Sequence, residues 1–540
     1  MSRLGALLVQ RLRRDWLQLT LWIAGTVALA LSGFAGVAEA YGTEQDRLGI
    51  LAAVMANPVI LLFRGLPSGP DRSAFVVFLL FPFLAMMAAF MSAFLAVRHT
   101  RGDEEAGRLE LIDATPAGRW MPTVATLVHG VLANAVLGIL VALSLLAGGA
   151  ETEGSLLVGF AAAATGLVFL GLGMLSAQLM RTSRAANSLT VWILLSTFVL
   201  AGVGNALGTP SDDLTHMESS WLAWTSPFGW AENTRAYDEN LWWPALLCIG
   251  AFLVLTAGAF ALQAGRDQGA GIVAERRGRA NARAGLASTT ALVSRLSAPS
   301  TIGWIVGALV AGALSTALGS VVDQIGGENP AIADVLTSLA AGSDLQQSVI
   351  VVFFMMIGLL AACAAVQTVA RARQEETHGT AEPVLATPTA RVRWLADFLI
   401  AGVVAVALTC AGGVAGAALG AIGSDAASEL IRSAAVAAAG QVVAASVFLV
   451  LTALVFTVAP RLTIPLGWTL LVVAIVIGLF GPLLGLSDEV TQTLSPFAVT
   501  PQLDGDTIDL RGLPWLLLAV VAGGAASLGL MRRRELAAAG

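Results

Sequence analysis

The sequence has 540 residues, of which 56% are apolar and only 12% are charged. Soluble globular proteins carry about 25% charged residues, so this composition excludes an ordinary soluble protein and an intrinsically disordered one. The formal net charge is −6, and all 30 basic residues are arginine. An acidic balance of this kind also argues against nucleic acid as a partner.

Apolar stretches long enough to cross a lipid bilayer recur along the chain. A hydrocarbon core about 30 Å thick requires about 20 apolar residues per helix. The fold class expected is therefore an all-α polytopic membrane protein. The stretch 50–63, which contains Pro58, is too short to span and is expected to lie in the interface or to re-enter. The twelve predicted spans are 18–38, 74–97, 121–148, 155–180, 188–208, 243–264, 301–322, 346–369, 394–422, 430–458, 464–485 and 513–531.

The distribution of arginine predicts the orientation of the chain in the membrane. If the N-terminus is cytoplasmic and every predicted span crosses, the cytoplasmic segments contain 24 of the 30 arginines. Cytoplasmic loops of membrane proteins carry such an excess of basic residues. We therefore expect both termini in the cytoplasm and a multi-pass protein of the plasma membrane.

The first 16 residues have the pattern of an amphipathic helix. Leu4, Leu8, Leu12 and Trp16 share one helical face, and arginines occupy another. This pattern favours an interfacial helix on the cytoplasmic surface over residues 1–16 and disfavours a cleaved signal peptide.

The chain contains an internal duplication. At a constant offset of 272, Arg101, Glu104, Gly107 and Glu110 align with the same residue types in the second half, at Arg373, Glu376, Gly379 and Glu382. Ser226-Pro227-Phe228 aligns with Ser495-Pro496-Phe497 at an offset of 269. Because each half begins and ends inside, the halves are expected to be parallel six-span repeats. The predicted organisation is a first half at 17–264, a cytoplasmic linker at 265–300 and a second half at 301–540.

The duplicated cytoplasmic loop is the strongest candidate for a functional site. It predicts a short acidic helix that ends at a Thr-Pro turn, where the threonine caps the next helix. One copy alone is most simply a solvated loop with surface ion pairs, but two copies at fixed spacing favour a docking site for a basic groove on a partner. The candidate docking residues are Glu104, Glu105, Gly107, Glu110, Thr115, Pro116, Glu375, Glu376, Gly379, Glu382, Thr387 and Pro388.

This loop pattern, Glu-Glu-x-x-Gly-x-x-Glu followed by Ala-Thr-Pro, resembles the coupling-helix loop of type-2 ABC exporter membrane domains. The whole chain resembles the fused, double-length permeases of actinobacterial antibiotic and multidrug exporters of the tetronasin type. The resemblance implies a separate ABC ATPase subunit, in two copies, that binds ATP and Mg²⁺. The copies differ, since Arg108 corresponds to Thr380 and Asp113 to Leu385, so the two docking sites are expected to be unequal.

The chain itself carries no motif for ATP hydrolysis or for other catalysis. A phosphate-binding P-loop requires a lysine, and the sequence has none. The linker is also far shorter than a nucleotide-binding domain, which needs well over about 100 residues. The three cysteines and four histidines lack metal-ligand spacing. We therefore expect a transport subunit without a cofactor of its own.

Aromatic and methionine residues at matching positions of the second and eighth spans are weak candidates for the path of a lipophilic cargo. Such adaptable side chains suit varied apolar ligands, although packing or lipid contact is the simpler interpretation of each. The polar residues His129, Asn134, Gln178 and Gln441 are expected to form hydrogen bonds between helices. The path candidates are Phe83, Met86, Phe90, Met91, Phe353, Phe354 and Met356.

The last outer loop of each half carries the Ser-Pro-Phe motif. Serine as N-cap followed by proline predicts the start of a helix. The family resemblance implies a re-entrant helical hairpin here that closes an outer gate, with Ser226, Pro227, Phe228, Ser495, Pro496 and Phe497 as the candidate gate residues.

The leading hypothesis is the permease subunit of an ATP-driven exporter of a lipophilic small molecule, such as a drug-like compound or a lipid. A proton-coupled twelve-span carrier is the alternative, and it predicts buried acids and no partner. A membrane enzyme or scaffold is a third hypothesis, and it requires a catalytic cluster that the sequence does not display. Export is favoured over import because no large outer domain is predicted.

Overall fold

The structure is a computed structural model that describes residues 3–55, 61–62, 64–113, 118–273, 285, 288–317, 345–424, 426–480, 495–497, 499–504, 507–510 and 512–535. The chain forms two compact units, Met1–Gly278 and Arg279–Gly540. The division falls within the stretch expected to be a linker. Each unit is described by itself below.

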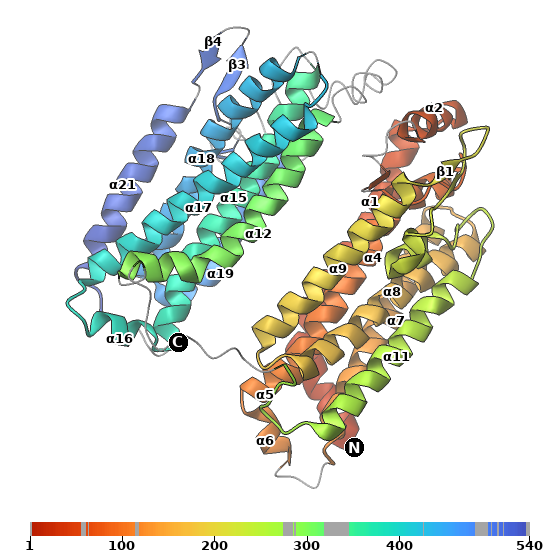
Figure 1. Cartoon of the computed structure of the whole chain (residues 1–540), viewed down its shortest axis with the longest axis horizontal. Coiled ribbons are helices and arrows are strands. Elements are labelled where there is room, and N and C mark those ends of the chain that lie inside the picture. The colour runs from red at the N-terminus through yellow and green to blue at the C-terminus, as the bar shows by residue number, and fades with distance from the viewer. Residues whose placement is uncertain are drawn as a thin grey trace. The chain divides into compact units, whose positions relative to one another are not determined.

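The first unit is a bundle of long helices with its short elements at the two ends (Figure 1). Its elements are α1 (Arg3–Ala40), α2 (Glu44–Met55), α4 (Arg72–Val97), the π-helix η1 (Arg98–Gly102), α5 (Asp103–Glu105), α6 (Arg108–Asp113), α7 (Met121–Ala147), α8 (Thr152–Leu179), α9 (Ser183–Ala206), β1 (Thr209–Pro210), β2 (Met217–Glu218), the 3-10 helix η2 (Ala223–Thr225), α10 (Pro227–Glu232) and α11 (Trp243–Gly265).

The second unit is also a helical bundle. Its elements are α12 (Thr289–Ala317), α15 (Leu345–Thr377), α16 (Ala381–Leu385), α17 (Arg391–Gly420), α18 (Ala427–Val458), the 3-10 helix η4 (Pro460–Leu462), α19 (Thr463–Phe480), β3 (Gln502–Asp504), β4 (Thr507–Asp509) and α21 (Leu513–Met531). Each unit thus contains one antiparallel pair of very short strands among its described residues, β1 with β2 and β3 with β4.

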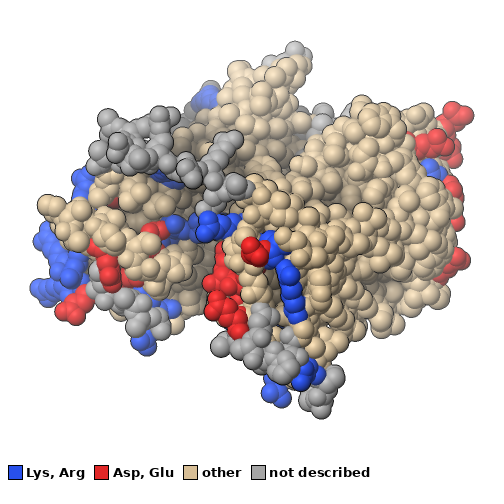
Figure 2. All heavy atoms as spheres, turned by 60° about the horizontal axis from the view of Figure 1, so that its bottom comes forward, with Lys and Arg blue, Asp and Glu red and all other residues tan. Residues whose placement is uncertain are grey.

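Eleven helices within the described ranges are long and apolar enough to cross a membrane. They coincide with eleven of the twelve predicted spans. The remaining prediction, 464–485, overlaps α19, and its residues 481–485 lie outside the described residues. A shorter apolar helical stretch, Pro460–Ile475, covers η4 and part of α19. The surface in Figure 2 is mostly uncharged, and its charged side chains gather in separate clusters. The all-α polytopic class is therefore confirmed.

The N-terminal helix is longer than the sequence suggested. The expected interfacial helix over 1–16 and the expected span at 18–38 form one continuous helix, α1. Its charged residues Arg11 and Asp15 are buried, while Trp16 is 63% exposed. The helix thus turns two charged side chains into the protein and an aromatic ring outward, because Arg11 and Asp15 find partners on neighbouring helices, as described below.

The core of the first unit is built around α4 and α8, whose buried residues are mainly alanine, glycine and aromatic residues. Phe75 and Phe78 of α4 and Phe169 of α8 are fully buried. In the second unit α15, α17 and α18 take this place, and Phe354, Phe398 and Phe456 are fully buried within one hydrophobic cluster. Small residues bring the helices close together, and the aromatic rings fill the remaining space.

Buried polar residues form hydrogen bonds across the bundles, and Asn134 joins two helices, as expected. Asn134 donates to Ser92 Oγ at 2.8 Å and thereby links α7 to α4. Gln178 accepts a hydrogen bond from Arg266 at 3.0 Å, and Gln441 donates to Thr500 at 3.3 Å. Each of these amides satisfies a polar group that would otherwise be costly in an apolar interior.

Candidate functional site

The duplicated loop of the first unit follows directly from α4. The helical hydrogen bonding widens to a π-helix over Arg98–Gly102, continues into α5 and resumes in α6. Single-turn π segments often occur at functional positions because they reorient the side chains that follow. Figure 1 shows that α5 and α6 lie at one end of the first bundle.

The first glutamate of the motif is held inside the protein. Arg266, which directly follows α11, forms a bidentate ion pair with Glu104, with both N···O distances at 3.0 Å. Arg101 Nη1 lies 3.0 Å from the same carboxylate. The side chain of Glu104 is only 8% exposed. Glu104 therefore ties the end of α4 to the end of the unit's last long helix.

The second unit repeats this arrangement. Arg534, which follows α21, donates to both carboxylate oxygens of Glu376 at 2.7 Å. Arg373 pairs with Glu376 at 2.9 Å, as Arg101 does with Glu104. We call these two sets, Arg101–Glu104–Arg266 and Arg373–Glu376–Arg534, the arginine–glutamate triads. Their third members, Arg266 and Arg534, were not predicted from the sequence, although they stand 268 residues apart, close to the offset of the duplication.

The glycine of the motif is explained by backbone conformation. Gly107 has φ +68° and Gly379 has φ +71°, a region that residues with a side chain rarely adopt. Each glycine amide donates back to the carbonyl of the triad glutamate, Gly107 to Glu104 at 3.0 Å and Gly379 to Glu376 at 3.2 Å. The motif therefore encodes a helix that stops at a buried glutamate and turns at a left-handed glycine.

The other acidic residues of the loops are more accessible than the triad glutamates. Glu105, Glu110 and Glu382 are exposed, and Glu105 accepts a hydrogen bond from the backbone of Ser183 at 2.9 Å. Glu375 is half-buried and pairs with Arg371 at 2.5 Å. The accessible acidic surface of the loops therefore comes from these residues, because Glu104 and Glu376 are occupied internally.

The Thr-Pro turn differs from its prediction where it is described. In the second unit α17 begins at Arg391 with Ala390 as its N-cap, so Thr387 does not cap this helix and Pro388 is not its first residue. The hydroxyl of Thr387 instead donates to the carbonyl of Val384 at 2.5 Å and closes the end of α16. Thr115 and Pro116 lie outside the described residues.

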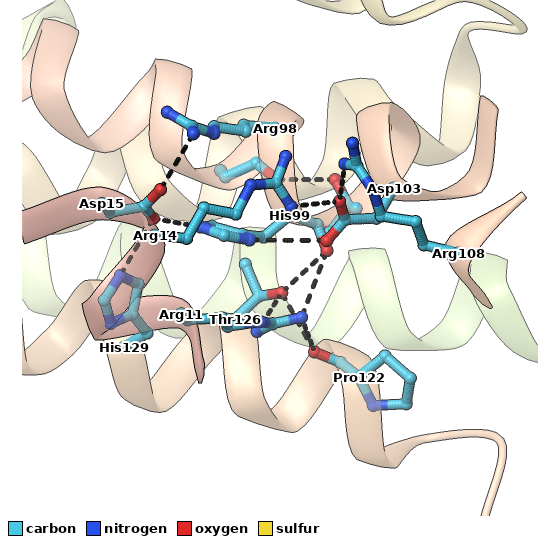
Figure 3. Close-up of polar contacts among 12 residues, drawn as sticks. Arg11, Arg14, Asp15, Arg98, His99, Asp103, Arg108, Pro122, Thr126 and His129 are labelled. Carbon is cyan, nitrogen blue, oxygen red and sulfur yellow. Dashed lines mark hydrogen bonds and ion pairs between the residues drawn. The ribbon is translucent and has the colours of Figure 1, made fainter. Parts of the chain in front are cut away.

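Next to the first loop lies a buried charged cluster, which is shown in Figure 3. Asp15 of α1 contacts the Nε2 atoms of both His99 and His129, the latter at 3.3 Å. His99 Nδ1 faces Asp103 at 3.4 Å, and Asp103 pairs with Arg108 of the loop at 2.8 Å. The cluster joins α1 and α7 to the duplicated loop.

Arginines complete this cluster. Arg14 pairs with Asp103 at 2.8 Å, and Arg98 pairs with Asp15 at 3.2 Å. Buried Arg11 donates to Thr126 Oγ at 2.9 Å and to the carbonyl of Pro122 at 3.0 Å. These contacts hold α1 against the start of α7.

Three members of the cluster have donor atoms that could hold a metal ion. The ligand atoms of Asp15, His99 and His129 lie within 4.8 Å of one another, and all three residues are buried. Arg98, however, already pairs with Asp15, and the buried guanidinium of Arg11 interacts electrostatically with Asp15 and Asp103. An additional cation would be repelled there, so the cluster is better described as an internal ion-pair network.

The candidate path residues occupy different environments. Met91 and Phe354 are buried core residues, and Met356 is 43% exposed. Phe83 lies beneath the guanidinium of Arg64, with 5.8 Å between the guanidinium carbon and the ring centroid. Phe90 stacks on its helical neighbour Phe94. The half-buried members of the set are Phe83, Met86, Phe90 and Phe353.

The Ser-Pro-Phe motif begins a helix in the first unit, as predicted. Ser226 is the N-cap of α10, its hydroxyl accepts from the Phe228 amide at 3.2 Å, and Pro227 is the first helical residue. Phe228 is fully buried against Phe169 and Phe198.

The second copy of this motif adopts another local structure. Pro496 and Phe497 lie in a turn, and Ser495 precedes it, so no helix starts here within the described residues. Phe497 is buried and stacks on Phe448, with ring centroids 5.3 Å apart.

A buried acid in α10 was not anticipated. Glu232 accepts a hydrogen bond from Asn205 at 2.6 Å and lies outside the eleven spanning helices. Burial raises the pKa of Glu232 to about 8, and the hydrogen bond from Asn205 opposes this rise. The corresponding position in the second half, at the offset of 269, is Pro501, so the duplication offered no signal for Glu232.

Two helical bundles, each with several helices long and apolar enough to cross a membrane, define a polytopic membrane protein. The family model of the multidrug efflux system permease Rv1217c, C-terminal domain, matches residues 286–534. The chain is 35% identical over 534 residues to the multidrug efflux system permease protein Rv1217c of Mycobacterium tuberculosis (strain ATCC 25618 / H37Rv). The aligned region covers 97% of this chain and 93% of that protein. The chain belongs to this family of multi-pass plasma-membrane efflux permeases, which confirms the expected resemblance to exporter permeases.

Proposed function

We propose that this chain is the permease subunit of an ATP-binding-cassette exporter, which moves a lipophilic small molecule out of the cell. ATP and Mg²⁺ bind to a separate ATPase subunit, two copies of which dock on the two duplicated loops. The chain crosses the membrane twelve times, and both of its termini are cytoplasmic. No group in this chain hydrolyses ATP, so the permease acts as a transport subunit.

The observation that carries this proposal is the duplicated loop with its arginine–glutamate triad. Each triad joins the end of the second spanning helix of a unit, α4 or α15, to the end of its last long helix, α11 or α21. Buried ion pairs in which two arginines hold one carboxylate favour a fixed geometry, and the Arg266–Glu104 pair is bidentate. A force applied to the loop therefore reaches two spanning helices at once, which is what docking of a nucleotide-driven partner requires.

The accessible acids beside each triad provide the docking surface. Glu105 and Glu110 in the first loop and Glu382 in the second are exposed. A basic groove on the ATPase would be attracted to them, and charge complementarity of this type sets the rate and the register of docking. The first loop has two exposed glutamates, Glu105 and Glu110, whereas in the second loop Glu382 is exposed and Glu375 is half-buried. This difference supports unequal docking strengths.

Affinity purification tests the proposal. The full chain is purified from its own membranes in mild detergent, and ATP hydrolysis is measured in the eluate. We expect an ATPase to co-purify with the wild-type chain and its recovery to fall by about tenfold or more in the double variant Glu110→Arg and Glu382→Arg. Glu153→Arg, an exposed acid in the first turn of α8, is the matched control. An eluate without ATPase activity would refute the proposal.

The proton-coupled carrier is kept as a second candidate because of Glu232. A buried acid with a pKa of about 8 can exchange a proton near neutral pH. The two candidates are separated by collapsing the proton gradient in cells whose ATP level is maintained. Efflux that persists supports the ATP-driven exporter, and efflux that stops supports the carrier.

A further inference from the structure

The first unit contains an apolar groove between α1 and α7. It has a volume of about 620 Å³, and its lining runs from Leu12 to Val27 on α1 and from His129 to Leu140 on α7. His129 and Thr20 are the polar side chains among the lining residues. None of the seven path residues suggested by the sequence belongs to this lining. A volume of this size accommodates a drug-sized molecule.

In the second unit, part of the corresponding helix pair, α12 and α17, packs closely. A Cβ atom on Gly312 of α12 would lie 1.9 Å from the carbonyl oxygen of Gly413, and one on Gly416 of α17 would lie 1.9 Å from that of Leu309. Helix backbones that approach this closely leave no room for a ligand. At the offset of 272, Leu140 of the groove corresponds to Gly412. At the same offset, Gly312 and Gly413 correspond to positions 40 and 141, which lie beyond the lining of the groove in the first unit. A smaller pocket of about 210 Å³ lies among α12, α16 and α17 of the second unit.

His129 gives the groove a specific chemistry. Its Nε2 atom lies 3.3 Å from Asp15 Oδ2, and Asp15 is ion-paired with Arg98. An ionised carboxylate can only accept hydrogen bonds, so Nε2 carries the proton in the neutral tautomer of His129. Nδ1 is then a hydrogen-bond acceptor. A ligand that satisfies this histidine must therefore offer a donor, such as a hydroxyl or an amine N–H.

The same histidine lies at the end of a series of contacts that leads to the duplicated loop. Asp15 contacts His129 and His99, His99 faces Asp103, and Asp103 pairs with Arg108 of α6. Figure 3 shows these side chains directed toward one another. A molecule bound beside His129 would therefore lie next to the network that anchors the first loop.

We propose that the groove between α1 and α7 is a cargo-binding site for a lipophilic molecule that carries a hydrogen-bond donor, with His129 as the acceptor. The role of this molecule as cargo rests on the proposed function, whereas its binding does not. A lipid acyl chain fills an apolar groove equally well but offers no donor to His129. The preference for a donor-bearing ligand is therefore the property that separates cargo from bulk lipid.

Photolabelling of the full chain tests the site. The protein is reconstituted in nanodiscs without any partner and is labelled with a long-chain alcohol that carries a diazirine, or with the methyl ether of the same alcohol. Labelled peptides are identified by mass spectrometry. One hydrogen bond corresponds to a preference of about fivefold. We expect the alcohol to label 12–27 and 129–140 about fivefold more strongly than the ether does, and 401–412 of α17 to show no such preference.

Two variants and one control make the test specific. Val136→Trp places an indole in the groove and is expected to lower the alcohol labelling about tenfold, since it removes the apolar site. Leu408→Trp is the control at the equivalent position of α17, because Val136 is 45% exposed and Leu408 is 47% exposed. His129→Phe is expected to abolish the difference between alcohol and ether while it retains labelling by both.

The proposal is overturned by three outcomes: equal labelling of the wild-type groove by alcohol and ether, no labelling of the groove, or unchanged labelling in Val136→Trp. The first outcome would identify the occupant as a lipid chain, and the second would mean that another part of the chain covers the groove. Since no ATPase is present, these results are independent of the purification experiment. If no ATPase co-purifies with the chain but the groove still prefers the alcohol, the proposed function is refuted and the proposed binding site is retained.

Discussion

Removing the negative charge of one triad should destabilise the second unit strongly. Glu376 is 2% exposed and is held by Arg373 at 2.9 Å and by Arg534 at 2.7 Å to each oxygen. The side chains of these arginines are only 4% and 8% exposed. Glu376→Gln would remove the carboxylate charge that two buried guanidinium groups contact, which costs about 3–5 kcal/mol.

The neighbouring residue offers a matched control for this variant. Glu375 pairs with Arg371, but both side chains are more exposed, at 13% and 20%. Glu375→Gln removes the same charge from the same loop and should cost only about 1 kcal/mol or less, because solvent screens the pair. The comparison isolates burial as the cause of the difference.

The assay is thermal unfolding in detergent, followed by the loss of monodisperse protein on size exclusion. For a unit of 150–250 residues, 1 kcal/mol shifts Tm by about 2–4 °C. Glu376→Gln should therefore lower the midpoint by about 6–20 °C and Glu375→Gln by a few degrees at most. Glu376→Gln combined with Arg534→Gln should cost less than the sum of the single variants, because the two side chains interact. Equal shifts for Glu375→Gln and Glu376→Gln would refute the reasoning.

Two further predictions concern backbone conformation and pH. Gly107→Ala and Gly379→Ala should each cost about 1–2 kcal/mol of stability because their φ angles are positive, although an added Cβ meets no atom within 4 Å. Gly118→Ala is the neutral control, because Gly118 also has open space but no positive φ. Equal melting temperatures for all three variants would exclude conformational strain. Burial raises the pKa of Glu232 from 4.5 to about 8, so the native state binds the proton more tightly and stability should fall as pH rises from about 4.5 to 8. Glu232→Gln should weaken this fall and exceed the wild type in Tm above pH 8, and an unchanged pH profile would contradict the assigned pKa.

The sequence identified the duplicated loop but not the role of each residue in it. The repeated spacing indicated that Glu104 and Glu376 are functionally important, and their negative charge suggested contact with a basic partner. The fold placed both side chains against arginines that lie more than 150 positions away in the chain. A motif read in one dimension cannot distinguish an exposed carboxylate from one that is paired with a distant residue, because burial is a property of the packed helices.

The same limit applies to the polar residues of the first helix. Arg11 and Asp15 lie within the predicted amphipathic surface helix 1–16, in which charged residues would face water. In the structure α1 continues through Ala40 and turns these residues toward His99, His129 and Thr126. Partners supplied by η1 and α7 bury these two side chains, whereas Arg13 and Arg14 remain exposed, and no local pattern distinguishes the two pairs.

Hydropathy, helical periodicity and the internal duplication therefore determined the membrane class, eleven of the spanning helices and the position of the repeated loops. These features are local or repeat at a fixed spacing, and the lipid bilayer imposes them on every segment separately. Tertiary structure alone decided the triads, the Asp15–His99–His129 network, the buried Glu232 and the groove beside His129. Each of these depends on which helices meet and how closely, because burial, ion pairs between distant residues and grooves arise only when the helices pack together.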